Sequence, residues 1–137
     1  MSRRDDDARI VSQYLPKNTT LTVMNGHDVW VFTMQTEVRI AFKIGIYYDP
    51  DERGYAALAI APEIEGRLKD GPHPGHLFSD GSICFGGTRS RVHDTLRETY
   101  AKSCFWAEGI ALAIAGKTHF PFSKNNRESE ADNFRNL

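Results

Sequence analysis

The chain has 137 residues and carries 17 Lys plus Arg against 18 Asp plus Glu, for a formal net charge of −1. Apolar residues make up 40% and charged residues 26%, which favours a single globular core over disorder. The balanced charge argues against a general nucleic-acid binder, because such proteins usually carry a basic excess.

Hydropathy and cysteine content indicate the expected compartment. No apolar run reaches the roughly 18 residues that a membrane span needs, and residues 1–7 lack the apolar region of a secretory signal. We therefore expect a cytoplasmic protein with no membrane partner. In a reducing cytosol the two cysteines, Cys84 and Cys104, are expected to be free thiols.

The first half of the chain predicts one helix followed by strands. Residues 4–14 mix charged with apolar side chains and predict a short amphipathic helix that ends near Pro16. Stretches rich in β-branched and aromatic residues then alternate with turn signals such as Asn25-Gly26. Sequential strands with short turns favour an antiparallel meander. The four predicted strands cover residues 20–24, 29–36, 38–48 and 55–61.

The second half predicts a long loop and a main helix. Residues 62–93 are rich in Pro and Gly without clear periodicity, and their apolar pieces favour a functional loop that packs onto the domain. Apolar residues three or four apart over residues 94–115 predict a helix that stops at Gly116. We expect one α+β domain over residues 1–122 and a polar tail over residues 123–137.

The chemistry-bearing candidate is Cys84, which is flanked by Gly81, Gly86 and Gly87. Glycines let another chain approach closely. A thiolate is a nucleophile, and it is a good leaving group once acylated. His76 is the candidate donor to an oxyanion. Cys104 lies on the apolar stripe of the main helix, where a thiol acts as a small hydrophobic side chain.

The residues alone leave other interpretations open. Cys84 could simply pack, or it could belong to a Cys-His hydrolase with His76, His93 or His119 as base. A zinc site on His73, His76 and Cys84 lacks an obvious fourth ligand, so no metal is expected. The basic group Arg89, Arg91 and His93 is either a solvated surface or a binding site for an acidic partner.

The residues around Cys84 resemble a known family. The segment His76-Leu77-Phe78-Ser79-Asp80-Gly81-Ser82-Ile83-Cys84 resembles the active-site segment of ubiquitin-conjugating enzymes, above all that of the bacterial branch. There the pattern is a histidine, an apolar-aromatic pair, an Asp-Gly turn and then the cysteine. The later Phe105-Trp106-Ala107-Glu108-Gly109 is also similar. The likeness is specific over residues 72–122 and rests on element order over residues 1–62.

The chain departs from the family at two places. Eukaryotic members carry His-Pro-Asn, with the Asn eight residues before the cysteine, whereas here His76 stands at that position and His73-Pro74 is offset by one. His76 therefore either donates to an oxyanion or braces the loop, and His73, Asp80, Gly81 and Ser82 are expected to support that loop. We expect the family's usual C-terminal helices to be reduced to residues 123–137.

The resemblance implies a thioester carrier without metal or organic cofactor. Cys84 would accept the C-terminus of a ubiquitin-like protein, or of a cyclic-nucleotide-producing nucleotidyltransferase, and pass it to an amine. Bacterial relatives often belong to antiphage defence operons. The chain has no Gly-rich phosphate loop, so any ATP-dependent activation would either come from a separate activating enzyme or be absent. The competing hypothesis within the same fold is an inactive scaffold that only binds a partner.

Overall fold

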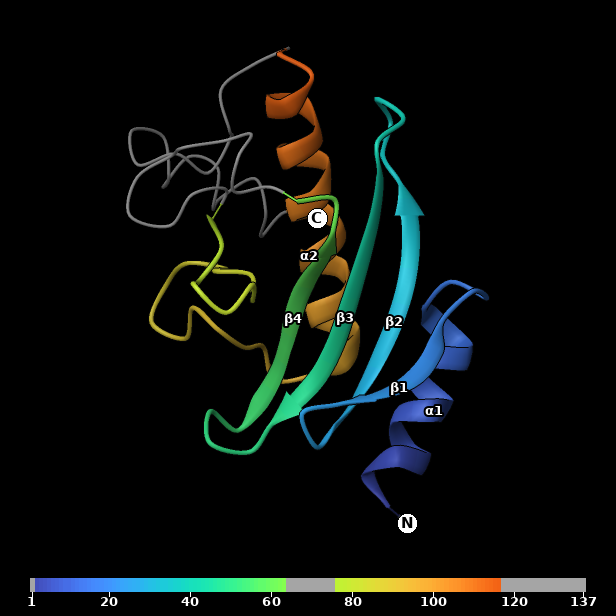
Figure 1. Cartoon of the computed structure of the whole chain (residues 1–137). Coiled ribbons are helices and arrows are strands. Elements are labelled where there is room, and N and C mark those ends of the chain that lie inside the picture. The colour runs from blue at the N-terminus through green and yellow to red at the C-terminus, as the bar shows by residue number, and fades with distance from the viewer. Residues whose placement is uncertain (1, 64–75, 117–137) are drawn as a thin grey trace.

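The computed structural model describes residues 2–63 and 76–116 (Figure 1). The predicted tail at residues 123–137, together with His73 and His119, lies outside these residues. The element order confirms an α+β chain with a four-stranded antiparallel meander, β1-β2-β3-β4. The elements are α1 (Arg3–Tyr14), β1 (Thr20–Met24), β2 (His27–Gln35), β3 (Ala41–Asp49), β4 (Gly54–Ala61) and α2 (Leu96–Ile114).

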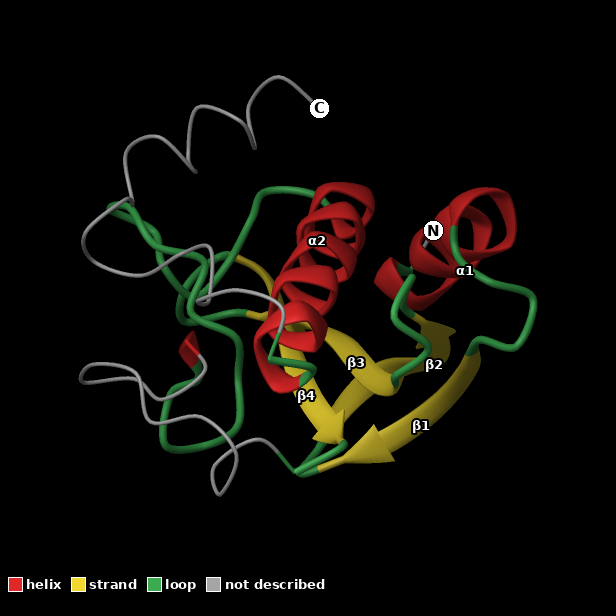
Figure 2. Cartoon of the chain, turned by 90° about the horizontal axis from the view of Figure 1, so that it is seen from above, coloured by secondary structure: helices red, strands yellow, loops and turns green. Residues whose placement is uncertain are grey.

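The sheet and the helices form two layers, with both helices on the same face of the sheet (Figure 2). Helix α2 packs across β3 and β4, and α1 lies beside the β1–β2 end of the sheet (Figure 1). Large side chains fill the space between the layers, and Phe42 meets Trp106 edge to face at 5.7 Å between ring centroids. The fully buried core includes Phe32, Phe42, Ile44, Ile46, Trp106 and Ile110.

Three predicted boundaries differ from the structure by two residues or more. Strand β2 begins at His27 rather than at residue 29. Strand β3 begins at Ala41 rather than at residue 38, because residues 36–40 form a turn in which Thr36 N–H donates to the Ile40 carbonyl at 3.0 Å. Arg39 takes a positive φ of 65° within that turn. Helix α2 begins at Leu96 rather than at residue 94, because the side chain of Thr95 accepts from Glu98 N–H at 3.0 Å and caps the helix. Among the described residues, no helix is both long and apolar enough to cross a bilayer.

A buried hydrogen bond attaches α1 to the sheet. The Tyr55 hydroxyl of β4 donates to Asp7 Oδ1 of α1 at 2.6 Å, and the Asp7 residue is only 7% exposed. Burial raises the pKa of Asp7, although the Tyr55 hydrogen bond and the Arg3 charge oppose that shift. Burial and the bond to Asp7 raise the pKa of Tyr55 to about 12. The tyrosine is therefore a permanent donor at neutral pH, and it satisfies a carboxylate that water barely reaches.

Replacing Tyr55 with Phe tests this attachment. Tyr55→Phe keeps the ring but leaves the buried Asp7 carboxylate without its donor, so we expect a loss of about 1–3 kcal/mol in the free energy of unfolding. The measurement is urea denaturation at pH 7. Tyr48→Phe is the matched control, because the Tyr48 ring packs on the Tyr55 ring while its hydroxyl makes no hydrogen bond to the described residues. Equal losses for both variants would contradict the assignment.

Candidate active site

The segment that carries Cys84 is anchored at both ends to the outer edge of β4. On the near side, Ile83 N–H donates to the Ala57 carbonyl at 2.8 Å, and Ala59 N–H donates to the Gly81 carbonyl at 3.0 Å. On the far side, Tyr55 and His93 exchange backbone hydrogen bonds of 2.8 and 3.0 Å. Cys84 therefore lies on a loop that leaves the sheet edge and returns to it, the yellow loop beside β4 in Figure 1.

The residues before Cys84 form a small hairpin. Gly81 N–H donates to the Phe78 carbonyl at 2.9 Å, and Phe78 N–H donates to the Ser82 carbonyl at 2.8 Å. Gly81 has a φ of +87°, as expected for a tight turn that ends on a left-handed residue and a bulge. The Asp-Gly pair of the sequence thus makes the turn that directs the chain into the cysteine.

His76 and Cys84 face each other across this hairpin. Cys84 N–H donates to the His76 carbonyl at 2.7 Å, and Leu77 pairs with Ile83 between them. His76 has a φ of +56°, a conformation in which His is enriched among non-glycine residues. The structure therefore pairs the backbones of His76 and Cys84, and their catalytic roles stay a prediction.

Cys84 itself is half-buried. The preceding Ile83 is completely buried, which fixes the backbone before the thiol. After the thiol, Phe85 N–H donates to the Ser90 carbonyl at 2.7 Å and closes the glycine-containing loop. Cys84 is therefore a partly exposed residue on a backbone held from both sides.

Asp80 and Ser82 form a hydrogen-bonded unit with Arg91. Asp80 Oδ1 accepts from Ser82 N–H at 3.0 Å and from its hydroxyl at 2.5 Å. Arg91 Nη1 donates to Asp80 Oδ2 at 3.1 Å and to Ser82 Oγ at 3.0 Å. Partial burial alone would raise the pKa of Asp80, but the hydrogen bonds from Ser82 and Arg91 outweigh it and lower that pKa. Asp80 is therefore a structural anion of the turn.

Arg89 and His93, the other two basic candidates, also contact the rest of the fold. Arg89 forms an ion pair with Asp94, and its Nη2 donates to the carbonyls of Glu52 and Arg53 at 3.0 and 2.8 Å. The role of Arg89, Arg91 and His93 as a binding site for an acidic partner stays a prediction.

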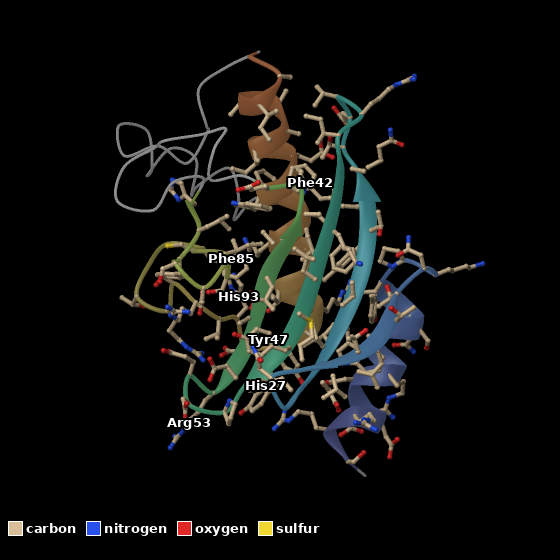
Figure 3. All side chains as sticks on the ribbon, viewed as in Figure 1. His27, Phe42, Tyr47, Arg53, Phe85 and His93 are labelled. Atoms are coloured by element: carbon tan, nitrogen blue, oxygen red, sulfur yellow. The ribbon has the colours of Figure 1, made fainter. Side chains whose placement is uncertain are left out.

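His93 packs against the residue that follows Cys84. Its ring lies 4.5 Å from the Phe85 ring between centroids (Figure 3). Burial lowers the pKa of His93, although Glu98, whose Oε1 is 3.6 Å from Nδ1, opposes that shift. The imidazole is therefore biased toward its neutral form and serves as part of the loop's packing.

The remaining candidates are the second cysteine, a metal site and two further histidines. Cys104 is half-buried on α2, and burial raises the pKa of its thiol to about 11, so it stays protonated at neutral pH. Within residues 2–63 and 76–116, no group of three or more His, Cys, Asp and Glu side chains could hold a metal ion. His73 and His119 lie outside these residues.

Two contributors to the site were missed at the sequence level. The Phe78 ring lies 4.0 Å from the Arg91 guanidinium carbon and stacks on it. Gly54 lets the returning segment approach β4, because a Cβ there would lie 2.7 Å from Val92 Cγ2 and 2.8 Å from the His93 carbonyl oxygen. The Gly54 position between a turn and a strand was visible in the sequence, but its partner was not.

Comparison with known proteins adds no relative. No family model, no curated protein and no solved structure matches the chain.

The left-handed residue of the hairpin gives a test of the site's construction. Gly81→Ala places a side chain at a φ of +87° with open space around it, so the cost is purely conformational, on the order of 1 kcal/mol. We expect faster hydrogen exchange at the Cys84 amide, measured by mass spectrometry. Gly116→Ala is the matched control, because Gly116 has a φ of +73° and equally open space. It should leave the Cys84 amide unchanged, and an equal effect of both variants would refute the assignment.

Proposed function

We propose that the chain is a ubiquitin-conjugating-enzyme-like thioester carrier in which Cys84 is the acceptor. The observation that carries the proposal is the half-exposed Cys84, held directly after the Asp80-Gly81 hairpin on the edge of β4. The family-like motif, the meander that precedes it and the helix that follows support the same assignment. The acyl donor is the C-terminus of a ubiquitin-like protein or of a cyclic-nucleotide-producing nucleotidyltransferase, in bacterial antiphage defence.

The reaction has two steps, charging and discharge. In charging, the Cys84 thiolate attacks the activated carbonyl carbon, a C–S bond forms, and the bond to the leaving adenylate or thiolate breaks. A separate activating enzyme supplies that activated acyl group. In discharge, an amine attacks the thioester carbonyl, a C–N bond forms, the C–S bond breaks, and Cys84 leaves as thiolate while the amine loses its proton to solvent or a base.

The backbone around Cys84 limits which groups could stabilise the oxyanion. Cys84 N–H is committed to the His76 carbonyl, and Phe85 N–H is committed to the Ser90 carbonyl. These two amides are therefore not oriented toward a tetrahedral intermediate. The side chain of His76, whose carbonyl accepts from Cys84 N–H, is the proposed donor or brace.

A trapping experiment tests the carrier role. Wild type, Cys84→Ser and Cys104→Ser are each co-expressed with the neighbouring gene products, and intact mass is read with and without a thiol reductant. We expect a reductant-labile adduct on wild type and on Cys104→Ser. Cys84→Ser should carry a reductant-resistant ester, because an oxygen ester resists thiols. A stable complex without any adduct would support the scaffold instead.

The dependence on His76 separates a carrier from a Cys-His hydrolase. For a carrier in which His76 donates to the oxyanion, His76→Ala still charges but discharges about 100- to 1000-fold more slowly, because one donor is lost. The measurement is single-turnover discharge of the isolated thioester to free lysine. His27→Ala, at the start of β2 where the ring packs on Tyr47, is the control and should discharge normally. A His76→Ala protein as inactive in charging as Cys84→Ala would favour the hydrolase.

A further inference from the structure

Arg91 links the chain before Cys84 to the chain after it. Its guanidinium donates to Asp80 and Ser82 at 3.1 and 3.0 Å, although Arg91 itself follows Cys84 by seven residues. The same group stacks on Phe78, 4.0 Å from the ring centroid. The side chain thus crosses the mouth of the loop and contacts three residues of the hairpin turn.

These contacts engage the surfaces with which an arginine would bind a partner. One nitrogen already donates to the carboxylate, and one face of the planar group lies on the aromatic ring. The Arg91 side chain is 34% exposed, against 54% for its partner Asp80. Nη1 and one face of the guanidinium are therefore engaged in holding the turn.

The turn that Arg91 holds is mechanically connected to Cys84. Ser82 is fully buried, and its N–H donates to the same Asp80 carboxylate that Arg91 binds. Ser82 is followed by the fully buried Ile83 and then by the thiol-bearing residue. A shift of Asp80 would therefore alter the direction in which the chain enters Cys84.

We propose that Arg91 is a positioning residue, which orients the Cys84 thiol through Asp80 and Ser82. This inference rests on the proposed carrier function for its consequence in catalysis. Orientation affects the attack on the carbonyl and the departure of the thiolate more than the affinity for the incoming amine. Loss of Arg91 thus lowers the maximal rate of discharge and leaves the half-saturating amine concentration unchanged.

The test compares Arg91→Gln with Arg89→Gln in a Cys104→Ser background. Arg89 lies in the same loop but binds Asp94 and the carbonyls of Glu52 and Arg53, so its variant also loses exposed polar contacts yet leaves the hairpin turn alone. Thermal unfolding should shift by about 2–4 °C at most for either variant, which shows that both proteins are folded.

Two readouts do not depend on any partner. Hydrogen exchange at the Ser82 and Cys84 amides should accelerate about three- to tenfold in Arg91→Gln. The alkylation rate of Cys84 by iodoacetamide should change by more than about twofold, and Arg91→Lys should restore part of both effects because it keeps the charge without the planar fork. Arg89→Gln should match wild type in both. An Arg91→Gln protein indistinguishable from Arg89→Gln overturns the proposal.

The discharge assay adds the catalytic readout. We expect Arg91→Gln to lower the maximal rate of discharge about tenfold at unchanged half-saturation by amine. Asp80→Asn should act alike, and the double variant should be no slower than either single one, because both remove the same interaction. Normal discharge despite faster exchange would overturn the positioning role. If no version forms a thioester, the carrier function fails, while exchange and alkylation still decide whether Arg91 positions the thiol.

Discussion

The pairing of the outer edge of β4 is the constraint on which the site depends. An edge strand leaves a row of backbone groups without partners, and a protein must cover or protect them. Here Ala57, Ala59 and Tyr55 pair with the loop rather than with a fifth strand. Two separate parts of that loop are thereby fixed to one rigid strand, and Cys84 is held between them. At the opposite edge, β1 pairs with β2 alone among the residues that the structure describes, and most of its residues are exposed.

Tyr55 connects this edge to both helices. Its carbonyl accepts from His93 N–H and from the Thr99 hydroxyl of α2, each at 3.0 Å. Its hydroxyl reaches Asp7 of α1 on the inner side of the sheet. One residue thus connects α1, β4, α2 and the returning end of the Cys84 loop. Because α2 and the loop share this acceptor, the core helix supports the site without contributing a reactive group.

Sequence patterns predicted the elements of this fold better than their connections. The Asn25-Gly26 turn and the strand periodicity predicted the meander, and the spacing over α2 predicted the core helix. The start of β3 was wrong because a turn stabilised by Thr36 and a left-handed Arg39 is not visible in apolar patterning. The burial of Asp7 was equally hidden, since its partner Tyr55 is 48 residues away.

The sequence likewise predicted the local motif of the candidate site but not the side-chain contacts within it. A cysteine between glycines after an Asp-Gly pair was recognisable from local chemistry. The three nearby basic residues suggested a surface for an acidic partner, and that role stays a prediction, because sequence shows which residues are charged but not what their side chains contact. The structure places Arg91 on Asp80 and Phe78, and places Arg89 on Asp94. These ion pairs form only once the loop has closed onto the edge of β4, and the local sequence does not show that closure.

The two cysteines are both half-buried, but they differ in the packing and backbone around them. At a pKa of about 11, Cys104 is thiolate in only about one molecule in ten thousand at neutral pH, and α2 surrounds it with core residues. An acyl group could reach it only by disrupting that packing. Cys84 combines partial exposure with glycines at positions 86 and 87, around which a Cβ would meet nothing within 4 Å. The chain after Cys84 is thus loosely surrounded among the described residues, while the β4 edge fixes the chain before it.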